Sequence, residues 1–426
     1  MKKVLIVAYY WPPAGGPGVQ RWLKFVKYLP EYGIRPVLYI PENPHYPILD
    51  QSLTEEVPED LTIYKSPIWE PYSWAGWLSK KKTKKISSGI VPRSNPSALD
   101  KIFLWIRGNL FIPDARKFWV KPSVKYLMEI LEKEGINTVI TTGPPHSLHL
   151  IGLGLKERQN IRWIADFRDP WTTIGYHKSL RLTRASEKKH SELEKKVLSS
   201  ADEILTTSKT TAAEFKKVTV RPVTVITNGY DSSPGFAVDG DGYFSISHIG
   251  SLLSERNPSV LWKVLSDLCR DDVEFHKALR IRLTGVVSDE IVQEIHNFGL
   301  KEVVEVHPDL PHEDALMAQR TSSILLLVEI NSEDTRGIIP GKLFEYMAAG
   351  RPVLAIGPKD WEAGTMLEDT GSGKVFTYTM EKELKNTILE WFRDFRKGTL
   401  NRVSPEIGQY SRKALTKKLS ERILWE

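Results

Sequence analysis

The chain has 426 residues, of which 41% are hydrophobic and 26% are charged, with a formal net charge of +6 and a single cysteine, Cys269. One hydrophobic core stops growing at roughly 250–300 residues, so this length predicts two domains and excludes a single small binding module. The sequence holds no stretch near the about 20 apolar residues that cross a bilayer, and one cysteine excludes an internal disulfide.

Short runs of apolar and β-branched residues, each followed by an amphipathic stretch, recur in both halves of the chain. This alternation is typical of parallel sheets covered by helices. The expected strands are residues 4–8, 37–40, 139–141, 163–166, 203–206 and 223–226, and then 245–249, 280–284, 303–306, 324–328 and 353–356. The pattern predicts an α/β protein with two doubly wound, Rossmann-like domains.

Turn-forming residues mark the boundary between the halves, from Asn228 to Gly242. Doubly wound sheets bind ligands at the carboxyl ends of their strands, so we expect the active site in a cleft that the two domains face. The expected organisation is a first domain over residues 1–232 with an insertion at about 66–118, a linker over 233–242, a second domain over 243–405 and a closing helix over 406–426.

The first strand runs into a glycine-rich turn that contains Gly15, Gly16 and Gly18. Glycines let the backbone approach a ligand closely, and the helix that follows presents free N–H groups to an anion. The dinucleotide-binding fingerprint is not matched. The turn therefore predicts an anion-binding loop, with a plain tight turn as the alternative.

The densest basic run, residues 80–85, follows a group of aromatic residues, namely Trp69, Tyr72, Trp74 and Trp77. Such a mixture suits peripheral contact with an anionic membrane, and a solvated loop with a few packed aromatics is the alternative. The sequence carries no RNA-binding signature and no zinc-knuckle spacing, so we expect no nucleic-acid partner.

Polar residues follow two further strands of the first half. His146 comes after residues 139–141, and Asp166, Arg168 and Asp169 come at the end of the next strand. Carboxyl ends of neighbouring parallel strands meet at one edge of the sheet. Asp166 and Asp169 are expected to receive hydroxyl groups of a ligand. Arg168 balances phosphate charge or pairs with one of these aspartates.

A second loop, from Arg336 to Gly341, opens a helix with Lys342 and Glu345 at neighbouring positions of one face. A cation at a helix terminus suits a diphosphate, and a carboxylate one turn later can accept both hydroxyls of a ribose. An ion pair on a surface helix is the alternative.

This last region resembles the retaining glycosyltransferase family 4. Residues 345–353, Glu-Tyr-Met-Ala-Ala-Gly-Arg-Pro-Val, are similar to the family's Glu-x-Met-Ala-x-Gly-x-Pro-Val signature. Residues 225–231 resemble the family's linker, and residues 249–257 resemble its donor loop. The resemblance spans essentially the whole chain and implies a GT-B fold, with the acceptor in the first domain and a nucleotide sugar in the second. Residues 66–118 are too long for an ordinary loop and are either an insertion or an acceptor-binding surface.

By this resemblance Glu345 binds the donor ribose, Arg256 stands where the family often has a diphosphate-binding lysine, and His146 lies near the transferred sugar. The family's usual arginine after the loop glycine is Ser251 here, and the first glutamate of its paired motif is Gly337. The expected catalytic residues are His146, Asp166, Arg168 and Asp169. The expected donor-binding residues are Gly15, Gly16, Gly18, Gly250, Ser251, Arg256, Arg336, Gly341, Lys342 and Glu345.

The sequence and the resemblance together predict a metal-independent retaining glycosyltransferase without a cofactor. We expect it to move a sugar from a UDP- or GDP-sugar to a glycan or polyprenyl-linked acceptor in surface polysaccharide or lipopolysaccharide biosynthesis. The expected location is cytoplasmic, with peripheral contact at the inner face of the plasma membrane. The alternatives are a nucleotide-sugar epimerase on the same fold and a non-catalytic assembly partner at the membrane surface.

Overall fold

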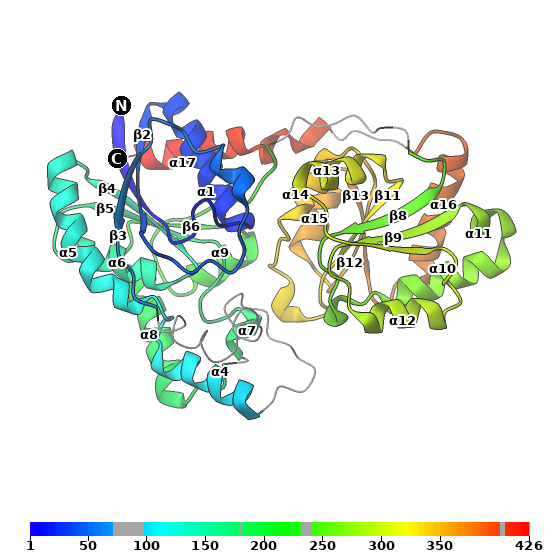
Figure 1. The fold of residues 1–426 in the computed structure, drawn as a ribbon, viewed down its shortest axis with the longest axis horizontal. Coiled ribbons are helices and arrows are strands. Elements are labelled where there is room, and N and C mark those ends of the chain that lie inside the picture. The colour runs from blue at the N-terminus through cyan, green and yellow to red at the C-terminus, as the bar shows by residue number, and fades with distance from the viewer. Residues whose placement is uncertain (71–97, 179, 232–237, 239, 401–404, 426) are drawn as a thin grey trace. The chain divides into compact units, whose positions relative to one another are not determined.

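The computed structural model describes residues 1–70, 98–178, 180–231, 238, 240–400 and 405–425. The chain folds into two compact units (Figure 1). Unit 1 comprises Met1–Asn228 and Arg412–Glu426, and unit 2 comprises Gly229–Ser411. Each unit contains its own parallel sheet, covered by helices, and its own hydrophobic core.

The described part of unit 1 contains a seven-stranded parallel sheet in the order β3-β2-β1-β4-β5-β6-β7. Its central strands are apolar on both faces, as a sheet covered on both sides requires. Edge strand β3 was not expected from the sequence, because it is half exposed and carries Lys65. The strands are β1 (Lys2–Val7), β2 (Ile34–Pro41), β3 (Thr62–Ser66), β4 (Thr138–Gly143), β5 (Arg162–Phe167), β6 (Glu203–Thr206) and β7 (Val223–Val225).

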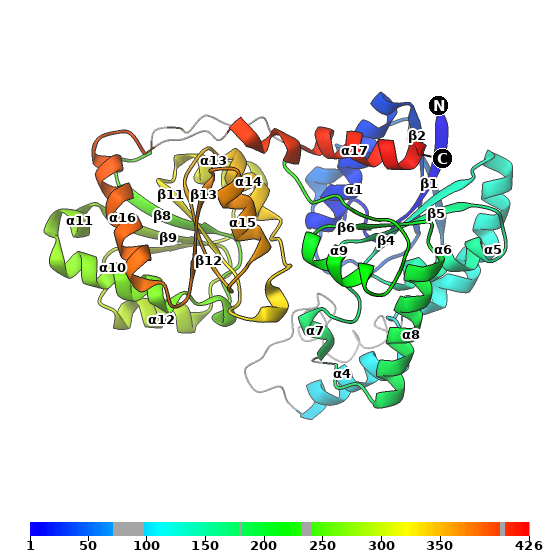
Figure 2. The same cartoon turned by 180° about the vertical axis from the view of Figure 1, so that it is seen from behind.

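Alternate residues of β1 enter opposite cores of unit 1. Val4 and Ile6 pack against α1 (Pro17–Tyr28) and α17 (Arg412–Leu424), whereas Leu5 and Val7 pack on the other side of the sheet. The helices of that other side are α5 (Lys117–Glu134), α6 (Ser147–Lys156), α8 (Arg184–Ser200) and α9 (Lys209–Lys216), as Figure 2 shows.

The last helix, α17, belongs to unit 1. Leu415, Leu419 and Ile423 recur every four residues and pack on α1. The preceding turn, η5 (Pro405–Tyr410), stays with unit 2, where Tyr230 donates its backbone N–H to the carbonyl of Tyr410. The segment expected as one closing helix over residues 406–426 is therefore divided between the two units.

The described part of unit 2 contains a six-stranded parallel sheet in the order β10-β9-β8-β11-β12-β13. Edge strand β13 was also not predicted from the sequence, because polar residues interrupt it. The strands are β8 (Phe244–Ile249), β9 (Leu279–Thr284), β10 (Val304–His307), β11 (Ile324–Val328), β12 (Val353–Gly357) and β13 (Gly373–Thr377).

Helices cover both faces of this second sheet. One face carries α10 (Ser259–Asp271), α11 (Val273–Ala278), α12 (Asp289–Asn297) and α16 (Glu381–Arg396). The other face carries α13 (His312–Thr321), α14 (Lys342–Ala348) and α15 (Glu362–Asp369). The two doubly wound, Rossmann-like sheets confirm the expected α/β fold class.

Part of the expected insertion is described. It contains α4 (Ala98–Leu110), and the nearby chain adds the short helix α7 (Gly175–Lys178). Tyr72, Trp74, Trp77 and the basic run at 80–85 lie outside the described residues. Among the helices of the described ranges, none has the length and apolar character needed to cross a bilayer.

Candidate functional site

The glycine loop of unit 1 brings the amino end of α1 against Arg168. A Cβ atom added to Gly18 would lie 1.4 Å from Nη1 of Arg168, so only a glycine leaves room for this guanidinium. Gly16 precedes α1 with a φ of 104°, a left-handed conformation that favours glycine. A Cβ on Gly15 would lie 3.1 Å from Cγ2 of Ile48. The loop is therefore built around the Arg168 side chain, and its contact with a donor stays a prediction.

Carbonyl oxygens of the loop after β4 hold Arg168. Its Nε donates to the carbonyl of Gly143 at 3.2 Å, and its Nη2 donates to the carbonyl of Pro144. These carbonyl groups orient the guanidinium, and the charges of Asp169 and Asp166 act on it. Asp169, the next polar residue of the strand end, is exposed.

Asp166 has a different environment from the one expected. It is fully buried and forms an ion pair with Arg21, whose Nη2 lies 3.0 Å from Oδ1. Its Oδ2 accepts hydrogen bonds from Trp22 at 2.8 Å and from Thr142 at 2.9 Å. Both oxygens are thus occupied by the protein. We correct the expectation that Asp166 receives ligand hydroxyls, and assign it to positioning α1 against β4 and β5.

The charge of Asp166 is fixed by these partners. Burial alone raises the pKa of its carboxyl, but the Arg21 guanidinium and the hydrogen bonds from Arg21, Thr142 and Trp22 outweigh burial and hold the pKa below its ordinary value. Arg21 also donates to the carbonyl of Thr227 at 2.7 Å. The network therefore joins the start of α1 to the ends of three separate chain segments.

His146 lies immediately before α6 and is 5% exposed. Its ring stacks on Trp171 with a centroid separation of 5.0 Å and an interplanar angle of 1°. Both ring nitrogens lack a hydrogen-bond partner among the described residues. Burial, with the neighbouring His149 next, lowers the pKa of His146 well below its ordinary value, so the imidazole is neutral. A buried neutral ring with two open nitrogens can exchange hydrogen bonds with a ligand.

Trp171, on which His146 stacks, is fixed by His190. The Trp171 indole N–H donates to Nδ1 of His190 at 3.0 Å, and His190 Nε2 lies 3.2 Å from the carbonyl of Gly108. An indole N–H can only donate, so Nδ1 accepts and Nε2 carries the proton. His190 is therefore fully paired, in contrast to His146.

In unit 2 the loop after β8 surrounds the end of a lysine. Gly250 has a φ of 108°, and a Cβ added there would lie 2.8 Å from Nζ of Lys342. Lys342 donates to the carbonyl of Ile249 at 2.8 Å and contacts Nε2 of His248 at 3.2 Å. Burial, and next the charge of Arg256, lower the pKa of Lys342 to about 8. Lys342 thus joins the donor loop to the start of α14.

Arg256 lies in the 3-10 turn η3 (Ser254–Arg256) and pairs with Glu329. Its Nε lies 3.3 Å from Oε1 and its Nη2 lies 3.4 Å from Oε2 of this fully buried carboxylate. Sequence reasoning missed Glu329. A signal existed, since it is the one charged residue that directly follows the wholly apolar strand Ile-Leu-Leu-Leu-Val.

The remaining expected donor residues of unit 2 have different environments. Glu345 is half-buried in the first turn of α14 and accepts a hydrogen bond from Gln319 at 3.4 Å. Ser251 is exposed, and Gly341 precedes α14 in an ordinary helical conformation. Arg336 pairs with its neighbour Glu333 at 3.8 Å on a side chain that is 41% exposed. The structure gives Arg336 no link to Lys342.

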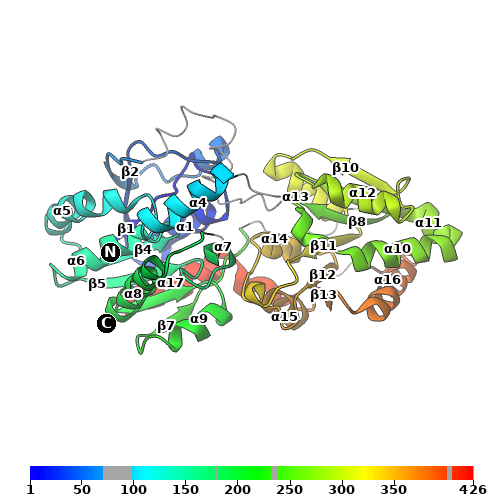
Figure 3. The same cartoon turned by 90° about the horizontal axis from the view of Figure 1, so that it is seen from below.

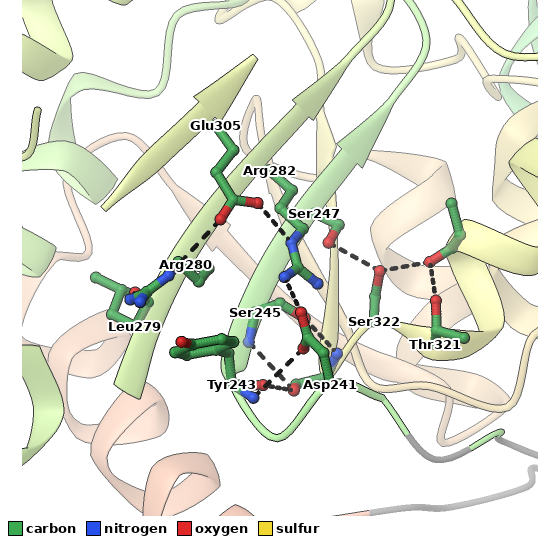
Figure 4. A network of polar contacts seen from close by, with 12 residues as sticks. Asp241, Tyr243, Ser245, Ser247, Leu279, Arg280, Arg282, Glu305, Thr321 and Ser322 are labelled. Atoms are coloured by element: carbon green, nitrogen blue, oxygen red, sulfur yellow. Dashed lines mark hydrogen bonds and ion pairs between the residues drawn. The ribbon is translucent and has the colours of Figure 1, made fainter. Parts of the chain in front are cut away.

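A cavity of about 250 Å³ lies beside the donor loop. Figure 4 shows the polar face of β8 and β9 that forms its base, where Arg282 pairs with Glu305 at 2.9 Å and Ser322 donates to Ser247 at 2.8 Å. Ile249, Thr284 and His307 line the cavity at the ends of β8, β9 and β10. The sequence analysis did not predict them as site residues. The cavity and the Lys342 region share the carboxyl end of β8.

The expected site residues thus form two groups. Gly18, Arg168 and His146 belong to unit 1, and Gly250, Lys342 and Arg256 belong to unit 2. Within the described ranges, no cluster of three or more His, Cys, Asp or Glu side chains is arranged to hold a metal ion.

Known proteins resemble this chain in sequence or in fold. Residues 89–233 match the family described as Glycosyltransferase Family 4. Sucrose-phosphate synthase from Thermosynechococcus elongatus shares the fold with a TM-score of 0.61 and 13% identity, over 99% of this chain and 98% of that one. HepE of Anabaena, solved with UDP-glucose, gives 0.60 and 12% over 99% of both chains. No curated protein matches the chain in sequence.

A third solved structure is WaaG, a glycosyltransferase involved in lipopolysaccharide biosynthesis, with a TM-score of 0.55 and 12% identity over 99% of this chain and 100% of that one. At these identities the likeness establishes the fold, which is the GT-B fold of glycosyltransferases. The match over residues 89–233 agrees with the family resemblance and contains the motif at residues 225–231, while the motifs at 249–257 and 345–353 lie outside it.

We expect Asp166→Asn to lower the free energy of unfolding of unit 1 by about 3–5 kcal/mol, because it leaves Arg21 buried without its counter-charge. Thermal and urea unfolding would measure the loss. Glu192→Gln is the matched control, since its partner Lys188 is 75% exposed and the pair contributes little. A stability of Asp166→Asn equal to wild type would show that the carboxylate is free for another role.

We expect nucleotide-diphosphate affinity to fall as pH rises above 8. The ammonium of Lys342 is present below its pKa of about 8 and is lost above it. A diphosphate favours the charged form, so the dissociation constant should rise by up to about tenfold per pH unit. Titration calorimetry at pH 7 to 9.5 would measure this. Lys342→Arg should remove the dependence, and a flat wild-type profile would place the diphosphate elsewhere.

Proposed function

We propose that this protein is a glycosyltransferase that moves a sugar from a UDP- or GDP-sugar to a hydroxyl group of a glycan or lipid-linked acceptor. The observation that carries the proposal is the pair of cations at the donor loop. Lys342 lies against Gly250 at the start of this loop, and Arg256 lies in the 3-10 turn near its end. This arrangement at the end of a doubly wound sheet is what a nucleotide diphosphate requires.

The diphosphate is the leaving group of the proposed reaction. Negative charge grows on it as the bond between the sugar carbon and the phosphate oxygen breaks, and fixed cations stabilise that charge without reorganisation. Lys342 and Arg256 are held by Ile249 and Glu329, so their positions are set before the donor binds. We assign the charge to these two side chains, without a metal ion. Glu345 accepts the ribose hydroxyls.

The acceptor hydroxyl forms the new bond to the same carbon. In the proposed retaining reaction it attacks from the face that the diphosphate leaves, and its proton passes to a phosphate oxygen of the departing nucleotide. His146, neutral and with both ring nitrogens open among the described residues, hydrogen-bonds the transferred sugar. Arg168 and the exposed Asp169 orient the acceptor.

The named neighbours guide the choice of substrate. HepE was solved with UDP and with UDP-glucose, and WaaG acts in lipopolysaccharide biosynthesis. We therefore propose UDP-sugars as the first donors to test and a surface-polysaccharide intermediate as the acceptor, at the cytoplasmic face of the membrane. An epimerase would convert the donor without an acceptor, and a non-catalytic partner would bind no donor.

Thermal unfolding with UDP-, GDP-, dTDP- and CMP-linked compounds, with EDTA present, tests the donor site. A ligand at a hundred times its dissociation constant stabilises the folded state by about 2.7 kcal/mol, which is a readily measured shift in melting temperature. We expect one nucleotide class to give this shift, and Lys342→Ala together with Arg256→Ala to abolish it. Absence of a shift with every class would contradict the donor assignment.

His146→Phe separates a catalytic role from a structural one. Phenylalanine keeps the stack on Trp171 and removes two unpartnered nitrogens, so we expect unchanged or higher stability. Transfer of radiolabelled sugar should nevertheless fall by a factor on the order of 100. His190→Phe is the control, because it breaks two hydrogen bonds and should lower stability instead. Full activity of His146→Phe would remove His146 from the reaction.

A further inference from the structure

Helix α4 presents an apolar face to solvent. Ile102, Ile106 and Leu110 are spaced four residues apart and share one side of the helix, whereas Leu104 lies on another side and is buried. Ile102 is 53% exposed and Leu110 is 54% exposed. Phe103 and Trp105 flank this face and are 46% and 42% exposed. Part of the apolar surface of α4 is thus turned toward solvent instead of the core.

Gly108 and Asn109 fix the end of α4 to the body of unit 1, beside α8 (Figure 3). The carbonyl of Gly108 lies 3.2 Å from Nε2 of His190, and a Cβ on Gly108 would lie 2.6 Å from Cδ2 of Leu182. Asn109 accepts a hydrogen bond from the backbone N–H of Thr183 at 2.8 Å. These contacts set the rotation of the helix, so the apolar face is held outward.

The apolar surface continues past the end of α4. Lys117 donates to the carbonyl of Leu110, and its Nζ lies 5.1 Å from the ring centre of Phe118. Phe118 is 43% exposed and packs edge-on against Trp69, with 4.9 Å between ring centres. We call Ile102, Phe103, Trp105, Leu110, Phe118 and Trp69 the α4 patch.

Basic residues border the α4 patch. Lys101 and Arg107 belong to α4 itself, and Lys117 adjoins Phe118. The charge of Lys189, on α8, acts on Lys117. The border therefore carries positive charge from three helices, α4, α5 and α8.

We propose that the α4 patch is a membrane-docking surface that inserts its apolar side chains among lipids while the bordering cations contact anionic headgroups. Six exposed apolar side chains in one region mark an interaction site. Aromatic side chains are common at protein and at membrane interfaces, but lysine is depleted at protein–protein interfaces and is typical of surfaces that bind anionic membranes. The charge border therefore selects an anionic bilayer over a protein partner. Docking is independent of sugar transfer and of any nucleotide.

Vesicle co-sedimentation of the full chain, without nucleotide or acceptor, tests the proposal. We expect binding to vesicles of phosphatidylcholine with phosphatidylglycerol and weak binding to phosphatidylcholine alone. Ile102→Gln, Phe103→Gln and Trp105→Gln combined should weaken binding at least tenfold and leave the melting temperature unchanged. Val218→Gln with Val220→Gln is the matched control, since these exposed valines of unit 1 lie after α9 and outside the patch.

A second measurement does not depend on the triple variant. Phe103→Cys in a Cys269→Ser background, labelled with an environment-sensitive fluorophore, should show a blue shift with anionic vesicles, and the same label at Val220→Cys should not. Two outcomes would overturn the proposal. In the first, the triple variant sediments with vesicles as wild type does. In the second, light scattering shows that wild type forms a dimer and that the triple variant does not, while vesicle binding is unchanged. Because no substrate is present, failure here leaves the donor-site assignment untouched.

Discussion

The ion pair between Arg21 and Asp166 is the contact on which the unit 1 site depends. Both side chains are fully buried, and the pair joins α1 to the end of β5. Trp22 and Thr142 complete the carboxylate's hydrogen bonds, while Arg21 also reaches the carbonyl of Thr227. A buried pair of this kind is costly to break from one side. It therefore holds the glycine turn of α1 where Gly18 can accommodate Arg168.

In unit 2, hydrogen bonds from a helix hold the loop of the site. The loop after β8 is held by side chains of α14, since Tyr346 accepts the backbone N–H of Ile249 at 2.9 Å and Lys342 donates to the carbonyl of the same residue. The backbone of the loop is thus satisfied at both polar groups of Ile249. The lysine that holds the loop is also the cation proposed to bind the diphosphate, so donor binding and loop position are coupled through one side chain.

The two buried histidines beside Trp171 differ in their hydrogen bonds. His190 uses both ring nitrogens and fixes the indole. His146 stacks on that indole and keeps both nitrogens open among the described residues. Unpaired buried polar atoms cost stability, so each one calls for an explanation, of which a catalytic role is one. This contrast supports the proposal that His146 hydrogen-bonds the transferred sugar.

The sequence by itself determined the two sheets, because an apolar strand followed by an amphipathic helix is a local pattern that needs no distant partner to be recognised. The spacing of Lys342 and Glu345 is also local, so the sequence could single out this segment as a candidate site. It failed at edge strands β3 and β13, where polar residues interrupt the pattern. Only the tertiary structure decided which charged residues form ion pairs within the chain. Asp166 and Arg21 are 145 residues apart, and Arg256 and Glu329 are 73 apart, so their pairing depends on how distant strands and helices pack.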